Sequence, residues 1–273
     1  KNNNKEIERP EYIYYFSGVR EVKPISPVNF DDFKKKELNE IKQYLKDWVQ
    51  PIDEYYGEST AGLSLLLQKT VSARFDEFAN NLQMFQLDNA KFVGAIIQGF
   101  SEALAECKQV NWLPIVRYCL WIITQKDNLS KGTKDIGMYA SWNSVKRAVF
   151  SFIEKGFTSK NVFPISLKNS LWDVIKEGVS GFDGDIFDEA DDKKDYYLIA
   201  INKARGVAFE CAIRYGLWLL QSLGIDNKKA NRSYCPELFA VLDQHLDTKY
   251  EKSKYILAIY GRWFPWLYLL DSA

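Results

Sequence analysis

The chain has 273 residues, of which 47% are hydrophobic, so it can bury a substantial core as one large domain or two smaller ones. Its 36 Lys and Arg residues balance 36 Asp and Glu residues. This balance argues against the field of one sign that draws a whole protein onto nucleic acid or an anionic membrane. Charges interrupt every long apolar run, so we expect neither a signal peptide nor a transmembrane helix.

The cysteines and the single histidine restrict the possible chemistry. Cys107, Cys119, Cys211 and Cys235 show no CxxC spacing, and they are predicted to be reduced core thiols of a cytoplasmic protein. His245 stands alone, which argues against zinc sites, catalytic triads and Cys/His pairs. We expect His245 to be structural or solvent-facing, and we expect no cofactor, metal or catalytic residue.

Helical periodicity dominates the chain after an extended lead over residues 1–29. Strand-like alternation is confined to the short YIYYF at 12–16. A further helix begins after Asn111, with Pro114 in the permitted first turn. The other predicted helices cover residues 31–49, 60–80, 88–107, 141–157, 166–179, 196–222, 235–246 and 250–270.

These elements predict an all-α fold, with residues 30–273 as one helical-repeat domain and a soft boundary near 126–140. The helix predicted over 196–222 keeps only a narrow polar stripe, formed by Lys203, Glu210, Arg214 and Gln221. A helix that is apolar on most sides is covered by neighbours on most sides. We therefore expect a layered stack of helices.

A cation followed four residues later by tryptophan recurs along the chain. The stretches read RYCLWII, KNSLWDV, RYGLWLL and RWFPWLY, and their cations are 51, 46 and 48 residues apart. This spacing is close to the period of about 40 to 47 residues of HEAT and armadillo repeats. The pairs are Arg117 with Trp121, Lys168 with Trp172, Arg214 with Trp218, and Arg262 with Trp266.

With the helix order, this recurrence predicts an irregular α-solenoid of stacked antiparallel helix pairs, with a period of about 48 residues. The third unit is irregular, because an acidic segment between Gly181 and Asp195 replaces a full partner helix. In each pair the alkyl stem of the cation can cover the indole one turn further along. For Arg214 we expect two local partners, Glu210 and Trp218, and we expect the tryptophans to pack in the core.

The stretches INKARGVAFECAIRYGLWLL, WLPIVRYCLWIIT and RWFPWLYLLD resemble helical-repeat regions of very large bacterial proteins. Some of those proteins carry an NTPase module and are linked to antiviral defence. The resemblance covers roughly the latter two thirds of the chain and implies a HEAT-like helical fold. No Walker A sequence is present, so the resemblance transfers no catalytic residue.

The acidic run DGDIFDEADD, over residues 183–192, is the one carboxylate cluster that suggests a metal. Asp183, Asp185, Asp188 and Glu189 are its candidate residues. The run departs from the Ca²⁺ loop pattern because Phe187 and Asp188 stand where a ligand and a glycine belong. A solvated loop is the expectation, and a metal site or a docking surface for a basic partner is the alternative.

Arg205 precedes Gly206 inside a predicted helix, where glycine costs about 1 kcal/mol relative to alanine. A close helix crossing is the expected reason, and a binding role for Arg205 is the alternative. Arg205 and Arg214 lie about 180° apart around the axis, so they cannot form one anion clamp. The lysines at 34–36, 193–194 and 228–229 are expected on solvated faces, since nucleic-acid binding would need them to converge with exposed aromatics.

These patterns predict a non-catalytic scaffold that binds a protein partner or another domain of its own chain. The chain starts without Met and stops just after the apolar FPWLYLLDSA, as expected for a fragment of a larger bacterial protein. Two other functions stay open. One is a nucleic-acid-sensing or clamping domain of a defence system, and the other is a metal-dependent helical enzyme that uses the carboxylates of 183–192.

Overall fold

The structure is a computed structural model that describes residues 24–51, 57–104, 110–126, 141–158, 163–181 and 194–271. These ranges are mostly α-helical and contain no β-strand, which confirms the predicted all-α class. Ile25 and Glu58 form the isolated β-bridge found there. No helix within the described ranges is long and apolar enough to cross a membrane.

The described residues of the N-terminal part form five α-helices and one 3₁₀ turn. The predicted helix over 31–49 is divided, because the backbone of Lys36 is extended and Glu37 starts a new helix with a capping box. The predicted helix over 60–80 is also divided, at the non-helical backbone of Arg74. The elements are α1 (Phe30–Lys35), α2 (Leu38–Asp47), α3 (Thr60–Ala73), α4 (Phe75–Asn80), η2 (Leu82–Phe85) and α5 (Ala90–Ala103).

The remaining elements follow the predicted helices closely, with one exception: the helix predicted over 196–222 is two helices. In chain order they are α6 (Trp112–Thr124), α7 (Trp142–Thr158), η3 (Ile165–Leu167), α8 (Lys168–Ser180), α9 (Tyr196–Ile201), α10 (Ala204–Ser222), η4 (Asn227–Lys229), η5 (Arg232–Tyr234), α11 (Pro236–Leu246) and α12 (Lys254–Leu270).

Helices α9 and α10 fold tightly against each other. A Cβ atom at Gly206 would lie 2.1 Å from the carbonyl oxygen of Ala200, so only glycine permits this approach. The close crossing expected at Gly206 is therefore confirmed. Asn143 of α7 fixes the beginning of α10, because its Oδ1 accepts a hydrogen bond of 3.1 Å from the backbone N–H of Ala204.

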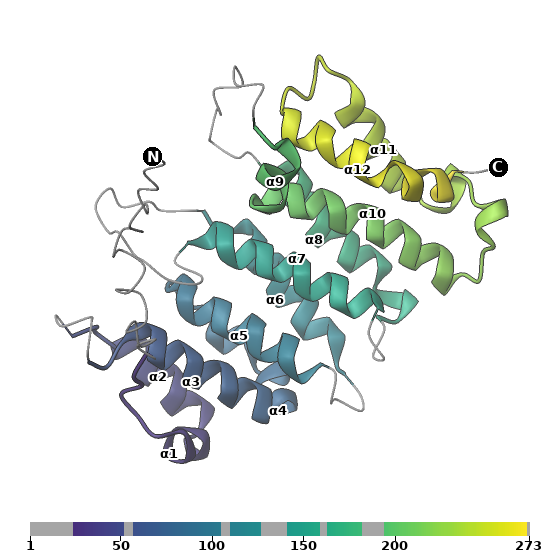
Figure 1. Ribbon diagram of the computed structural model, residues 1–273. Helices are drawn as coiled ribbons and strands as arrows, with labels where there is room; N and C mark the ends of the chain where they lie inside the picture. Colours follow the sequence, from purple (N-terminus) through teal and green to yellow (C-terminus); the bar gives the residue numbers. More distant parts are fainter. Residues whose placement is uncertain are drawn as a thin grey trace, which may run out of the picture.

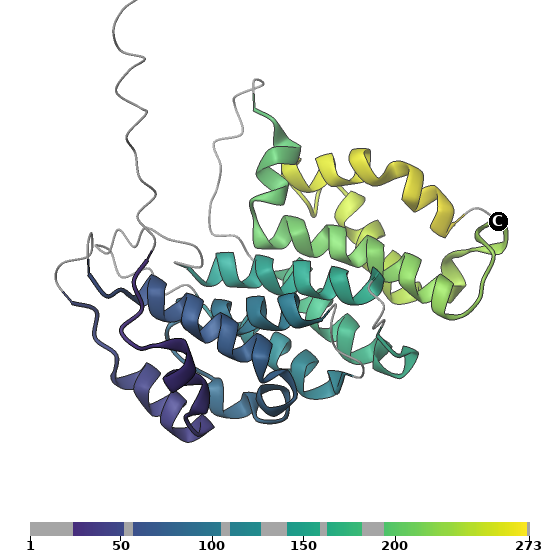
Figure 2. The ribbon, with the colours of Figure 1, turned by 60° about the horizontal axis from the view of Figure 1, so that its bottom comes forward.

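The helices form two rows. In Figure 1, α3, α5, α7, α10 and α12 follow one another across the front, and each packs against the next. Helices α4, α6 and α8 lie behind them, with α6 in contact with both α4 and α8. Figure 2 shows the same succession after a turn of 60°. The chain alternates between the rows from α3 to α8, and α10 then enters the front row beside α7.

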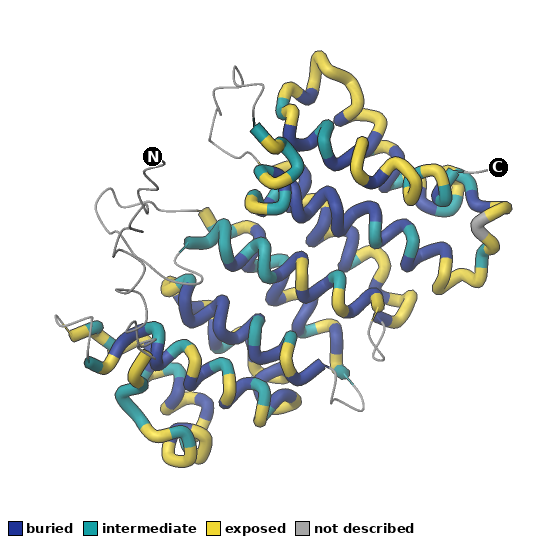
Figure 3. Tube along the Cα trace, in the orientation of Figure 1, coloured by how far each residue is buried: buried dark blue, intermediate teal, exposed yellow. Residues whose placement is uncertain are grey.

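Helix α10 lies at the centre of the packing. Figure 3 shows its tube as buried over most of its length, whereas α12 carries long exposed stretches. Tyr215 of α10 packs against Trp172 of α8, and Trp218 stacks on Phe157 of α7, with ring centres 5.3 Å apart in both contacts. Trp172 and Trp218 therefore lie in the core.

The described cysteines agree with the predicted reduced thiols. Cys119, Cys211 and Cys235 are free and buried. Burial raises the pKa of the Cys119 thiol to about 12, so this thiol stays protonated at neutral pH. Cys107 lies outside the described residues.

Candidate binding groove between helices α11 and α12

The last two helices of the described chain leave a groove between them. Helix α11 begins at Pro236, whose fixed φ suits the first helical position. Helix α12 packs on α9 and α10 with its buried face. The face of α12 next to this one is turned toward α11 and stays open. A cavity of about 650 Å³ lies between the two helices. Its lining is mainly apolar and aromatic and includes Phe239, Leu242, Leu246, Tyr260, Phe264 and Tyr268.

Large apolar side chains stand exposed at the edges of this groove. Phe264 is 67% exposed, Tyr268 is 61% exposed and Leu246 is 51% exposed. Single exposed apolar residues are ordinary, but a group of them around one cavity is typical of an interaction site. The groove therefore presents apolar surface that the described chain does not cover.

The charged side chains on the rim of the groove pair with one another. Arg232 forms ion pairs of 2.7 Å with Asp243 of α11 and with Asp271 just after α12. Its guanidinium also lies 4.8 Å from the ring centre of Phe239. Because Arg232 already has two carboxylate partners, it is not a free cation waiting for an anionic ligand.

Pro265 removes one backbone hydrogen bond from α12. It lies inside the helix and has no N–H group, so the carbonyl of Gly261 lacks the usual helical donor four residues later. Gly261 lines the groove, and a Cβ atom built on it would meet nothing within 4 Å. Gly261 therefore adds no side chain to the groove, and the lining at this point comes from the neighbouring aromatic residues.

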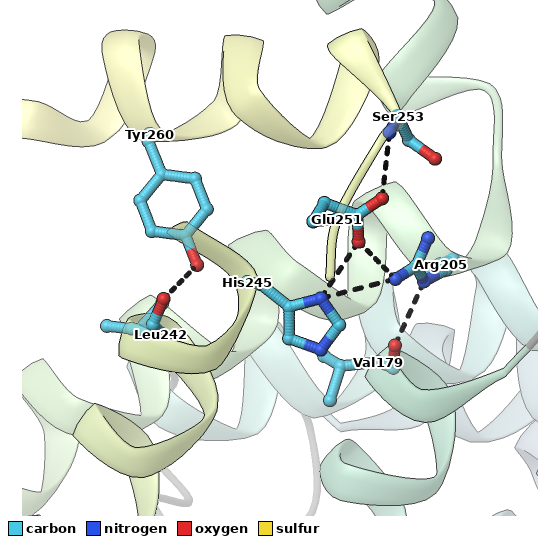
Figure 4. A network of polar contacts seen from close by, with 7 residues as sticks. All are labelled: Val179, Arg205, Leu242, His245, Glu251, Ser253 and Tyr260. Atoms are coloured by element: carbon cyan, nitrogen blue, oxygen red, sulfur yellow. Dashed lines mark hydrogen bonds and ion pairs between the residues drawn. The ribbon is translucent and has the colours of Figure 1, made fainter. Parts of the chain in front are cut away.

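A buried polar network holds the two helices that frame the groove (Figure 4). Glu251, in the connection between α11 and α12, is 4% exposed. Its Oε2 lies 2.5 Å from a guanidinium nitrogen of Arg205 and 2.8 Å from Nδ1 of His245. Its Oε1 accepts a hydrogen bond of 2.8 Å from the backbone N–H of Ser253. Arg205 also donates through Nε to the carbonyl of Val179, at 3.0 Å.

This network connects the end of α8, the beginning of α10, the end of α11 and the loop before α12. Burial raises the pKa of Glu251, but the hydrogen bonds from Ser253, Arg205 and His245 lower it by more, so the net pKa lies below its usual value. The contact with the carboxylate assigns the imidazole proton to Nδ1 of His245. Beside the network, Tyr260 donates to the carbonyl of Leu242 at 2.8 Å, which joins α12 to α11 directly.

The network shows where two of the predicted residues lie. Arg205 was a candidate for binding, and the structure places it in this buried cluster, with its side chain 14% exposed and occupied by partners within the chain. His245 is 3% exposed and has a structural position, one of the two expected. The acidic candidates Asp183, Asp185, Asp188 and Glu189 lie outside the described residues.

The local partners expected for Arg214 differ from the observed ones. Its guanidinium lies over the indole of Trp263 of α12, at 4.7 Å, and its Nε lies 3.3 Å from the carboxylate of Glu154 of α7. Glu210 instead accepts a hydrogen bond from the indole N–H of Trp263. The physical reason is the enclosed position of α10, because neighbouring helices offer closer partners than the next turn of the same helix.

The four predicted pairs have different environments. Their cations are exposed on α6, α8 and α12 and half-buried on α10, and among the described contacts none places a cation over the indole of its own pair. Trp121 is half-buried, and Trp266 is 38% exposed, which corrects the expectation that every tryptophan packs in the core. The exposed cations are Arg117, Lys168 and Arg262.

The sequence patterns did not single out the groove. Its aromatic residues on α12, Tyr260, Phe264 and Tyr268, recur every four residues and so lie along one side of the helix. This stripe lies beside the buried face of α12, so the helix is apolar over more of its circumference than one core contact requires. That excess was the available signal, but it resembled the pattern of a fully buried helix.

The described residues contain no group of three or more His, Cys, Asp or Glu side chains that could hold a metal ion. The candidate acidic run at 183–192 is outside that search. Comparison with known proteins adds no assignment, because no family model, no curated protein and no solved structure matches the chain.

Proposed function

We propose that this chain is a non-catalytic interaction module that binds a helix of a protein partner, or of another domain of its own chain, between α11 and α12. The observation that carries the proposal is the apolar and aromatic cavity of about 650 Å³ between these helices. A groove of this kind accepts the apolar face of a third helix, which is a recurring mode of peptide recognition.

The spacing of the lining residues favours a helix as the occupant. Phe239, Leu242 and Leu246 are three and four residues apart on α11, and the aromatic residues of α12 are four apart. Side chains at these spacings form ridges with a groove between them, into which a ridge of another helix packs. Arg232 on the rim is already paired with Asp243 and Asp271, so the lining that remains for an occupant is mainly apolar.

We also propose that the stack is an irregular α-solenoid of helix pairs with a period of about 48 residues. The serial packing of α3, α5, α7, α10 and α12 supports this proposal. The recurring cation and tryptophan would mark one helix of each pair. They fall on α6 and α8 in the rear row and on α10 and α12 in the front row. This change of row would follow from the third unit, which has no full partner helix before α10 among the described residues.

A cytoplasmic location, within a larger bacterial protein, belongs to the same proposal. The three buried free thiols support a reducing compartment. The resemblance to helical-repeat regions of very large bacterial proteins supports the wider context.

Selection from a display library of helical peptides would test the interaction function. The wild-type protein is the bait, and a variant carrying Leu246→Asp with Phe264→Asp is the counter-bait. Both residues are more than half exposed, so the variant should keep its circular dichroism and its melting temperature. We expect peptides with apolar residues at i, i+3, i+4 and i+7 that bind the wild type and lose at least tenfold in affinity for the variant.

A control variant, Val49→Asp, separates the groove from general apolar surface, because Val49 is 81% exposed and lies in the N-terminal part of the stack. Peptides should bind this variant as they bind the wild type. Peptides that bind all three proteins equally would contradict the assignment of the groove. Salt-sensitive retention on heparin, lost on substitution of surface lysines, would favour the nucleic-acid function instead.

A further inference from the structure

Four helices meet at a cluster of charged and aromatic side chains around the middle of α10. Glu154 of α7 faces Arg214 of α10, with Oε1 3.3 Å from Nε. The guanidinium of Arg214 lies over the indole of Trp263 of α12. Glu210 of α10 accepts hydrogen bonds of 2.8 Å from the indole N–H of Trp263 and from the hydroxyl of Tyr197 of α9. The cluster therefore links α7 to α9 and α12 through α10.

In this cluster Glu154 faces both the guanidinium of Arg214, which attracts its negative charge, and the carboxylate of Glu210, which repels it. Glu210 is buried, and the side chains of Glu154 and Arg214 are 22% and 40% exposed. Although Oε1 of Glu154 and Nε of Arg214 lie close together, neither atom has a hydrogen-bond partner. An ion pair without hydrogen bonds compensates poorly for the loss of solvent around both charges. A charged Glu154 therefore weakens the contact between α7 and α10.

The groups that act on Glu154 come from α10. They are Arg214, which favours its charged form, and Glu210, which opposes it. The Cys211 thiol of α10 also senses Glu154, and burial raises the pKa of this thiol, so it stays neutral. The charged residues on α7 itself and on α5 and α6, which also pack against α7, are Lys146, Arg147, Lys155, Lys91, Glu102 and Arg117.

Burial raises the pKa of Glu154 to about 7; Arg214 opposes this rise and Glu210 adds to it. The packed state therefore prefers the neutral carboxyl group, whereas an opened state prefers the carboxylate above the ordinary value of 4.5. The contribution of Glu154 to stability is full below pH 4.5, declines as the pH rises, and reaches its lowest level above pH 7.

We propose that Glu154, Glu210 and Arg214 form a pH-sensitive seam, at which loss of the Glu154 proton weakens the attachment of α10, and of the α12 helix packed on it, to α7. Near pH 7, Glu154 is protonated in some of the molecules and charged in the others. A small change in pH then alters how firmly the unit of α10, α11 and α12 is held against the preceding helices.

Native-state hydrogen exchange between pH 5 and pH 8 tests the seam. At each pH, the opening equilibrium of the α10 and α12 amides is measured in the wild type and in Glu154→Gln. The ratio of the two values cancels the intrinsic pH dependence of exchange. The wild-type opening should increase relative to the variant by roughly tenfold for each pH unit up to about pH 7, and then level off. Amides of α3, at the other end of the front row, should show no such change.

Two further variants keep the test decisive. Glu177→Gln removes an exposed carboxylate of α8 and should leave the pH dependence unchanged. Glu210→Gln removes the like charge beside Glu154, so the opening should level off at a lower pH. A ratio that does not vary with pH would overturn the seam, and so would equal changes in α3 and α10. If Glu210→Gln leaves the levelling pH unmoved or raises it, the explanation by repulsion between Glu210 and Glu154 is wrong.

Discussion

The buried pair of Arg205 and Glu251 allows a quantitative prediction. The side chains are 14% and 4% exposed, and Glu251 accepts hydrogen bonds from Arg205, His245 and Ser253. In Glu251→Gln the size is kept, but the charge is lost and a donor replaces one acceptor, so the guanidinium stays buried without a counterion. Breaking a buried pair in this way costs about 3–5 kcal/mol. The unfolding midpoint in urea should fall accordingly, and the melting temperature should fall by roughly 10 °C.

A double-mutant cycle isolates the interaction. If Arg205→Met is combined with Glu251→Gln, no unpaired charge is left behind, and the glutamine oxygen can still accept from His245 or Ser253. The double variant should therefore be more stable than the sum of the two single changes predicts, by about 2 kcal/mol or more. Arg232→Met is the matched control, because Arg232 forms ion pairs too, with two carboxylates, but its side chain is 54% exposed. Its loss should therefore move the midpoint far less than the loss of Arg205.

Two results would refute this reasoning. A cost below about 1 kcal/mol for Glu251→Gln would mean that the pair is solvated and is not a buried anchor of the groove. Additive effects in the cycle would mean that Arg205 and Glu251 act independently, in contradiction to the 2.5 Å contact between them.

Three further predictions can be checked by the same denaturation assay. Trp218→Ala should destabilise the fold by about 3–5 kcal/mol, whereas Trp266→Ala should cost about 1 kcal/mol or less; equal losses would contradict their different exposure, 2% and 38%. Gly206→Ala should cost about 1–3 kcal/mol, because the added Cβ atom would clash with the backbone of Ala200. Gly261→Ala should instead stabilise α12 by about 0.5–1 kcal/mol, because its Cβ atom would meet no neighbour. The opposite order of stabilities would be inconsistent with the crossing of α9 and α10. Since the pKa of Glu251 is lowered, its stabilisation is present above pH 4.5 and is lost under acid. The midpoints of wild type and Glu251→Gln should therefore converge as the pH falls below 4.5, and a constant gap would exclude this linkage.

Local chemistry explains why so much of the helical fold was predictable. A close helix crossing could be predicted at Gly206, because glycine destabilises a helix interior and is expected there only where a neighbouring backbone approaches closely. Breaks between helices were harder to predict, because the extended backbone of Lys36 and the turn at Asn202 interrupt apolar patterns that continue on both sides. Periodicity reports which residues face the core, but it does not report where the axis bends.

The contacts that define the candidate sites join distant parts of the chain. Arg205 and Glu251 are 46 residues apart, and Glu210 and Trp263 are 53 residues apart. A local rule paired Arg214 with Trp218 and Glu210, whereas the packing of α10 between α7 and α12 supplied Trp263 and Glu154. For an enclosed helix the choice between neighbours in sequence and neighbours in space depends on tertiary packing, which a single sequence does not encode in a readable pattern.

The missing N–H group of Pro265 interrupts the backbone hydrogen bonds of α12 beside the groove. The bond that it removes would have ended on the carbonyl of Gly261, a residue that lines the groove. Helices bend where such a bond is missing, so the width of the groove can change while the buried face of α12 keeps its contacts. Pro265→Ala restores the donor and should hold the groove at one width.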